Sequence, residues 1–169
     1  MPDATGLELI AQELRDRRAD GVLEATYFRN QAALLIEPSF IREALELIRG
    51  RGYTFLASLH GVDYYPEEPR LGVHYEMLDM KEVDRIRLTL RVPTDAATVD
   101  SVVDMFPTAN HQERETYDMF GVVFEGHPDM RRILMPEDYE GHPLRRDFPV
   151  GGEPVLFTHN EPRQPGWWK

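Results

Sequence analysis

Polar and apolar side chains alternate strictly from Arg85 to Val92. The apolar positions are Ile86, Leu88, Leu90 and Val92, and the polar positions between them are Arg85, Arg87, Thr89 and Arg91. Successive side chains of a strand point to opposite faces of a sheet, so this pattern predicts a strand with one covered face and one face in water. The chain is therefore expected to gather its helices on one side of a sheet.

The other segments before residue 125 are interpreted as elements of the same domain. Apolar residues at helical or alternating spacing, with turn residues between them, define each element. The last expected helix has Asn110 and Glu113 at N-terminal capping spacing, and Gly121 as its C-terminal stop. We expect helices at residues 5–18, 38–50, 99–106 and 111–120, and strands at 22–28, 32–36, 53–59, 71–78 and 84–92. This order predicts an α+β fold, a two-layer domain over residues 1–124 with a mostly antiparallel or mixed sheet.

The composition changes after residue 124. Seven of the 13 prolines lie between Pro128 and Pro165, and no periodic apolar segment of helix length follows. Residues 125–169 are therefore expected to form an extended C-terminal arm that wraps around a partner protein. Arginine pairs interleaved with Met, Leu and Phe are typical of protein interfaces. The expected interface residues are Arg114, Tyr117, Phe120, His127, Arg131, Arg132, Leu134, Leu144, Arg145, Arg146 and Phe148.

Composition also excludes several function classes. A net charge of −11 disfavours nucleic acid as the main partner, because such binding depends on Lys and Arg at phosphates. The chain has no cysteine, which excludes disulfides, thiolate-bound zinc and iron–sulfur clusters held by its own thiolates. No stretch approaches the roughly 20 apolar residues of a membrane span, and the N-terminus resembles neither a secretory signal nor a transit peptide.

Metal and acid–base sites are the remaining chemical possibilities. The six histidines do not pair at the spacing of a helical metal motif; they are His60, His74, His111, His127, His142 and His159. Glu113, Glu115 and Asp118 could act in acid–base catalysis, but acids near the start of a helix favour its dipole and Arg114 could pair locally with Asp118. No nucleotide-binding glycine loop or nucleophile elbow is present. The residues themselves thus predict no catalytic constellation.

The stretch ERETYDMFGVVFEGHPDMRRILMPEDYEGHPLRRDFP, residues 113–149, closely resembles the signature of the thirty-kilodalton subunit family of respiratory complex I. In bacteria the complex is the type 1 NADH:quinone oxidoreductase. The sequence GVDYYP, residues 61–66, and the HYEMLDM that follows resemble the middle region of the family. His111 is a departure, because the family usually has tryptophan at that place, and the tail after Pro149 is shorter than in many relatives.

The resemblance implies a non-catalytic core or assembly subunit in the peripheral arm of a proton-translocating complex. It implies a hetero-oligomer on the cytoplasmic side of the bacterial plasma membrane, with the C-terminal arm lying along the forty-nine-kilodalton subunit near the quinone site. No cofactor is expected on this chain; flavin and iron–sulfur clusters are expected on partner subunits. Alternatives are the equivalent subunit of a membrane-bound hydrogenase, deazaflavin or ferredoxin-linked complex, and, from another class, a stand-alone His/carboxylate metal hydrolase.

Overall fold

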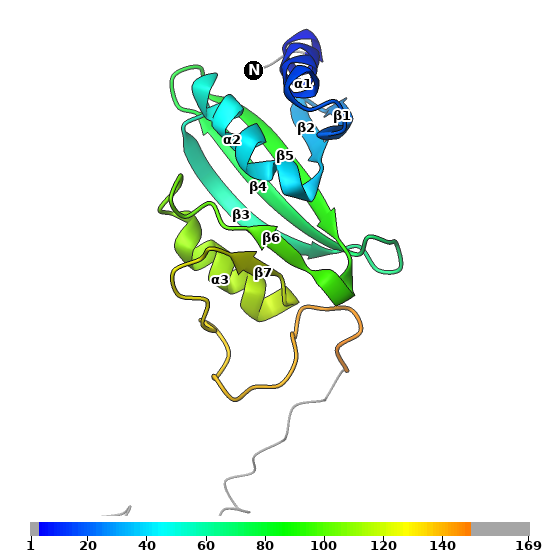
Figure 1. Ribbon diagram of the computed structural model, residues 1–169, viewed down its shortest axis with the longest axis vertical. Helices are drawn as coiled ribbons and strands as arrows, with labels where there is room; N and C mark the ends of the chain where they lie inside the picture. The colour runs from blue at the N-terminus through cyan, green and yellow to red at the C-terminus, as the bar shows by residue number, and fades with distance from the viewer. Residues whose placement is uncertain (1–3, 150–169) are drawn as a thin grey trace, which may run out of the picture.

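The computed structural model describes residues 4–149 (Figure 1). The end of the expected arm, residues 150–169, and with it His159, lies outside the described residues. The elements are α1 (Ala4–Arg17), β1 (Val22–Phe28), β2 (Gln31–Ile36), the 3-10 helix η1 (Pro38–Phe40), α2 (Ile41–Gly50), β3 (Phe55–Asp63), β4 (Leu71–Asp79), β5 (Asp84–Val92), the 3-10 helix η2 (Thr94–Ala96), β6 (Thr98–Asp100), α3 (Ala109–Phe120) and β7 (Val123–Glu125). Of the helices in this range, none has the length and apolar character needed to cross a bilayer.

The main sheet has five strands in the order β1-β2-β5-β4-β3. Two antiparallel units, β1-β2 and β5-β4-β3, join through a parallel pair in which Ala32 lies opposite Ile86. α1 and α2 lie over this sheet, and α3 packs along the edge strand β3 (Figure 1). The predicted α+β fold with a mixed sheet and two layers is confirmed.

The covered face predicted for β5 is confirmed, whereas the face expected in water is only partly exposed. Ile86, Leu88 and Leu90 are fully buried in the main core, together with the apolar stripe of α1 and the inner face of α2. Of the polar residues that alternate with them, Arg85 is exposed, Arg87 and Arg91 are half-buried, and Thr89 is buried. Because register along β4 and β5 is continuous, residues of β4 opposite the arginines share the face away from this core, which we call the open face.

The helix predicted at residues 99–106 is wrong. Residues 98–100 form β6, which pairs in parallel with β7, so that Val99 lies opposite Phe124. A single turn follows, in which the Phe106 amide donates to the Val102 carbonyl at 2.8 Å. Val99, Val102 and Phe106 are buried as expected, but their spacing reflects a strand followed by a turn. The partner strand lies too far along the chain for local periodicity to indicate it.

The predicted cap of α3 is also wrong, whereas its end is confirmed. The helix begins at Ala109, so Asn110 lies in its first turn and no side-chain cap is formed at Thr108. The carbonyls of Phe106 and Pro107 accept from the first helical amides instead. At the other end, Gly121 has a left-handed φ of 78° and donates its amide to the Tyr117 carbonyl at 2.8 Å.

Candidate partner interface on the C-terminal arm

Asp118 on α3 holds the first half of the described arm. Its side chain is fully buried, and Oδ2 accepts hydrogen bonds from the backbone amides of Ile133, Leu134 and Met135 at 3.0, 2.7 and 2.9 Å. Burial alone would raise the pKa of Asp118, but these amides and the guanidinium of Arg132 outweigh it and lower the pKa below its ordinary value. The carboxylate therefore fixes three consecutive arm residues to the domain.

Two arginines complete this attachment from opposite sides. Arg132 donates from Nη1 to Asp118 Oδ1 at 2.7 Å and from Nη2 to the Gly141 carbonyl at 2.9 Å. Arg114 on α3 donates to the carbonyls of Arg131 and Arg132 at 3.0 and 3.1 Å. Side chains thus bind both amides and carbonyls of the arm backbone. Each of these side chains either belongs to α3 or, like Arg132, is paired with Asp118 of α3.

The second half of the arm lies across the C-terminal end of α3. His142 Nδ1 lies 3.0 Å from the Asp118 carbonyl oxygen, and Arg145 Nε donates to the Phe120 carbonyl at 2.6 Å. These contacts satisfy carbonyl groups that a helix end leaves without an intrahelical partner. Gly121 leaves room for them, because a Cβ there would lie 2.6 Å from both Arg145 Nη2 and the His142 ring.

A second ion-pair network holds the arm where β3 and β4 meet their connecting loop. Arg70 is buried and donates to both oxygens of Asp63, at 2.8 and 2.6 Å, and to both oxygens of Asp147, at 2.9 Å each. The Arg146 amide also donates to Asp63 Oδ2 at 2.7 Å. Hydrogen bonding from Arg70 is the main reason that the pKa of Asp63 is far below its ordinary value. One arginine therefore joins the domain to the arm.

Glu113, near the start of α3, is the other fully buried carboxylate of this helix. It accepts from the Ser101 hydroxyl at 2.7 Å and from the Val102 amide at 2.8 Å, and so fixes the turn after β6. Burial raises the pKa of Glu113 to about 6, although both hydrogen bonds oppose this shift. Its position indicates a structural role inside the domain.

The arm presents apolar side chains outward while its backbone is held inward. Leu134 is 60% exposed and Leu144 is 54% exposed, and Ile133 beside them is exposed as well. The amide of Leu134 is bound to Asp118, and the amide of Leu144 donates to the Met119 carbonyl at 3.2 Å. Large apolar side chains on an ordered backbone are typical of protein interfaces.

The comparisons with known proteins agree with this geometry. The sequence pattern of the family described as respiratory-chain NADH dehydrogenase, 30 Kd subunit, matches residues 34–154. The chain belongs to this family. It is 41% identical over 157 residues to an NADH-quinone oxidoreductase subunit of Roseiflexus sp. strain RS-1, covering 91% of this chain and 90% of that protein.

Two solved structures resemble this member of the 30 Kd subunit family. The trypsin-resistant fragment of Nqo5, residues 1–134, matches with a TM-score of 0.64 and 29% identity, covering 73% of this chain and 98% of the fragment. A chain of the membrane-bound sulfane sulfur reductase, an archaeal respiratory membrane complex, matches with a TM-score of 0.71 and 25% identity over 85% of both chains.

The structure brings most of the predicted interface residues together, but several meet groups of their own chain. Arg132 and Arg145, both expected at a partner interface, bind Asp118 and the Phe120 carbonyl of this chain. The predicted local pair between Arg114 and Asp118 is wrong, because arm groups occupy both side chains. That these arginines also contact a partner stays a prediction, as does the domain boundary at residue 124.

The aromatic and histidine members of the predicted set pack within this family member too. Phe120 packs over Gly61, where a Cβ would lie 2.4 Å from its ring, and Tyr117 meets His142 edge-on. His127 lies 3.2 Å from the Asn110 carbonyl oxygen, and Phe148 stacks on Tyr139. The outward residues are Arg131, Leu134, Leu144 and Arg146. Sequence reasoning assigned no contact to Arg70, Asp63 or Asp147. Asp147 lies 77 residues from Arg70, and the spacing of 7 between Asp63 and Arg70 is typical of no regular element.

The histidines do not gather into a metal site in the described part of the chain. Between residues 4 and 149, no three His, Asp or Glu side chains are placed to share a metal ion. His60 and His74 stack across β3 and β4, and His74 Nε2 lies 2.8 Å from the Tyr64 hydroxyl. Burial is the main cause that lowers the pKa of His74 to about 4, so this ring is neutral at ordinary pH.

Proposed function

We propose that this chain is a non-catalytic core subunit of the peripheral arm of a proton-translocating NADH:quinone oxidoreductase. Its relatives at 41% identity and higher are named as subunits of NADH-quinone oxidoreductase, which supports this assignment. The enzyme is the assembled complex, and this chain contributes binding surface to it. It carries no flavin or cluster of its own, a view supported by the absence of cysteine.

The docking partner is the forty-nine-kilodalton subunit, contacted by the C-terminal arm near the quinone module. The observation that carries this proposal is the arm itself, whose backbone is fixed to α3 while Leu134 and Leu144 point outward. Preorganising the backbone before binding lowers the entropy cost of association, so the exposed leucines can anchor a partner efficiently. The complex holds the chain at the cytoplasmic side of the bacterial plasma membrane.

The relation between domain and arm follows from the same contacts. The fragment of Nqo5 that resists trypsin ends at residue 134 of that protein, which supports a compact domain followed by a more accessible segment. In this chain the attachment to Asp118 involves residues 132–135, so the first half of the arm acts with the domain. The partner-dependent part of the arm therefore begins later than residue 125.

A second candidate function is the equivalent subunit of another respiratory membrane complex. The similarity to a chain of the archaeal sulfane sulfur reductase over 85% of both chains supports this second candidate. The two candidates share the fold and the arm and differ in the other subunits. Mass spectrometry of the complex that co-purifies with the full chain distinguishes them, because only the first contains an NADH-oxidising module.

The test of the docking surface replaces single outward leucines of the full chain. Leu134→Asp and Leu144→Asp should each abolish co-purification with the forty-nine-kilodalton subunit and the NADH:quinone reductase activity of the complex. Leu9→Asp is the matched control, since Leu9 on α1 is similarly exposed but lies away from the arm. Thermal unfolding of the purified variants should remain unchanged. If both arm variants assemble as well as Leu9→Asp, the proposed docking surface is wrong.

A further inference from the structure

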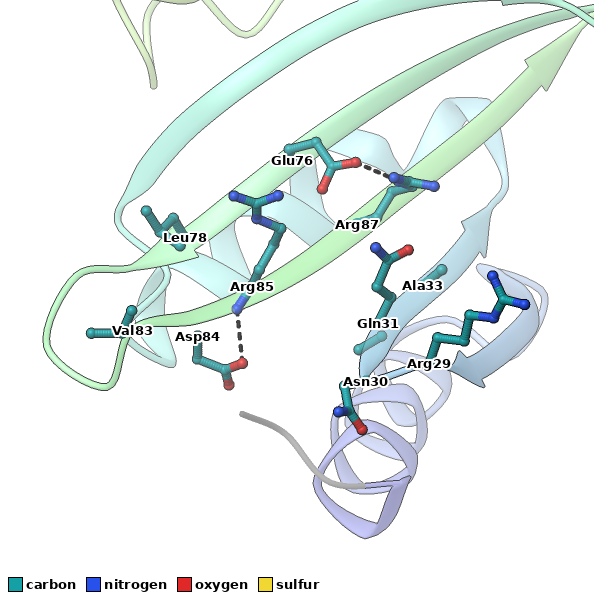
Figure 2. A pocket seen from close by; sticks show the side chains of 11 residues that line it. Arg29, Asn30, Gln31, Ala33, Glu76, Leu78, Val83, Asp84, Arg85 and Arg87 are labelled. Atoms are coloured by element: carbon teal, nitrogen blue, oxygen red, sulfur yellow. Dashed lines mark hydrogen bonds and ion pairs between the residues drawn. The ribbon is translucent and has the colours of Figure 1, made fainter.

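The open face of the sheet contains a hollow of about 460 Å³ at the end where β2, β4 and β5 come together (Figure 2). Gln31 and Ala33 of β2 lie on one side of it, and Glu76 and Leu78 of β4 on the other, with Arg85 and Arg87 of β5 between them. Arg29 and Asn30 of the β1-β2 turn and Val83 of the β4-β5 turn also line it. No part of the proposed arm interface contributes to it.

Some of the charged side chains that line this hollow have hydrogen-bond or ion-pair partners, and others have none among the described residues. Arg87 is paired with Glu76, and the buried Asp84 accepts from the Tyr53 hydroxyl at 2.6 Å. Within residues 4–149, the guanidinium groups of Arg29 and Arg85 have no hydrogen-bond or ion-pair partner; Arg29 only stacks over the ring of Phe28. Two unpaired guanidinium groups across one hollow form a local positive site in a chain with a net charge of −11.

The rim of the hollow is apolar and carries backbone strain. Val83, in the β4-β5 turn, has a left-handed φ of 52° and a side chain that is 74% exposed. A β-branched residue rarely adopts this conformation, so the backbone is strained here. Within the same turn Met80 is also exposed. The chain thus holds apolar side chains in water beside two unpaired cations.

We infer that this hollow is a second docking site, which takes an acidic, apolar-flanked segment of a partner subunit. Carboxylates of the segment bind the guanidinium groups of Arg29 and Arg85 in bidentate geometry, and its apolar residues cover Val83. The inference rests on the proposed function, because it requires that the chain be one subunit of a larger complex. The site lies on the open face, so this partner surface is separate from Leu134 and Leu144.

Other anionic occupants fit the observations less well. A free phosphate or carboxylate would use the guanidinium groups but leave Val83 and Met80 in water. An anionic membrane would face the whole chain with its net charge of −11, whereas a short protein segment meets only charges within the screening length of about 8 to 10 Å. Charge complementarity together with the apolar rim therefore favours a protein segment.

Charge reversal in the full-length chain, purified as part of its complex, tests the cationic half of the site. Arg85→Glu and Arg29→Glu should each weaken retention of one partner subunit about tenfold or more, and should abolish the salt dependence of that contact. Arg17→Glu, an exposed position on α1, makes the same charge change outside the hollow and serves as control. Equal retention of every subunit by all three variants would overturn the inference.

A crosslinking experiment identifies the occupant. A benzoylphenylalanine photo-crosslinker at Gln31 should capture a partner peptide that contains at least two Asp or Glu residues, whereas the same probe at Arg17 should not. Val83→Asn introduces a residue that tolerates the left-handed turn and removes the apolar side chain, so it should preserve or raise thermal stability while weakening retention. Crosslinks to lipid alone, or none in an intact complex, contradict the inference.

These outcomes separate the inference from the proposed function. If the chain co-purifies with no partner subunits at all, the proposed function fails. If the complex forms and responds to Leu134→Asp but not to Arg85→Glu, only the second docking site fails. Thermal shifts of the full chain with inorganic phosphate or with anionic lipid vesicles test the remaining occupants, and a shift lost in Arg85→Glu without any protein crosslink overturns the protein assignment.

Discussion

The two ends of α3 each bury one carboxylate completely, yet the two groups behave in opposite ways. Glu113 at the first turns receives two hydrogen bonds from neutral donors, and its pKa is raised to about 6. Asp118 near the last turn receives three backbone amides and a guanidinium, and its pKa is lowered. Burial raises the pKa of both acids, and only at Asp118 are the donors numerous and charged enough to outweigh it. The ionised one holds the arm.

The largest expected effect comes from Asp118→Ala. This change leaves Arg132 and three arm amides without their acceptor, and breaking such a buried pair costs about 3 to 5 kcal/mol of the free energy of unfolding. Urea unfolding measures the loss, and trypsin should now cleave at Arg131 and Arg132. A loss near that of an exposed pair, under about 1 kcal/mol, would mean that the arm is held elsewhere.

The pH dependence of Glu113 gives the next effect. Because its pKa in the folded chain is raised above the ordinary value of 4.5, Glu113 contributes stability that is present below pH 4.5 and lost as pH rises through about 6. The difference amounts to about 2 kcal/mol. His74, whose pKa is lowered, contributes the opposite trend, so the test compares wild type with Glu113→Gln at each pH. Parallel curves for the two proteins would contradict the assignment.

Gly121→Ala examines the helix end beneath the arm. The left-handed backbone should cost about 1 to 2 kcal/mol with alanine. Gly126 is the matched control, since its φ of 82° is similar but a Cβ there would meet no atom within 4 Å. A larger loss in thermal unfolding for Gly121→Ala than for Gly126→Ala therefore measures the contact with Arg145 and His142. Equal losses would indicate that Arg145 and His142 move aside at no measurable cost in stability.

The smallest effect is expected for Arg131→Ala. Arg131 lies next to Arg132 in sequence, but its side chain is 65% exposed and pairs only with Asp129 among the described residues. Exposed ion pairs of this kind contribute less than about 1 kcal/mol. Urea unfolding should thus barely change, in contrast to Asp118→Ala. A comparable loss in both variants would abolish the distinction between inward and outward arginines of the arm.

Much of the fold followed from local patterns, and the one element assigned to the wrong class depends on a partner distant in sequence. The bounds of β5 and the stop of α3 at Gly121 were predicted correctly, because alternation and a left-handed glycine act locally. β6 was predicted as helix because its partner β7 lies on the far side of α3 in the sequence. Strand pairing of that range has no signature in a short window.

The residues of the site were predicted from the sequence, but the groups that they bind were not. Arg132 and Asp118 were both singled out, yet Asp118 was paired with Arg114 because a spacing of four on a helix is a known favourable geometry. In the structure Asp118 instead binds the guanidinium of Arg132, which is more distant in sequence, together with three backbone amides of the arm. Which polar groups of a proline-rich segment turn inward depends on where the domain ends, and this cannot be deduced from sequence spacing.

The parallel pairing of β2 with β5 also constrains how the chain reaches its native state. The β1-β2 hairpin and the β3-β4-β5 meander each rest on contacts between neighbours in sequence, whereas Ala32 must find Ile86. Closing the long loop between β2 and β5 costs chain entropy before the contacts between these strands form. The pairing of β2 with β5 should therefore limit the rate of folding. α3, which carries Glu113 and Asp118, is synthesised after the main sheet. The arm is synthesised last, so the helix that binds it has already left the ribosome.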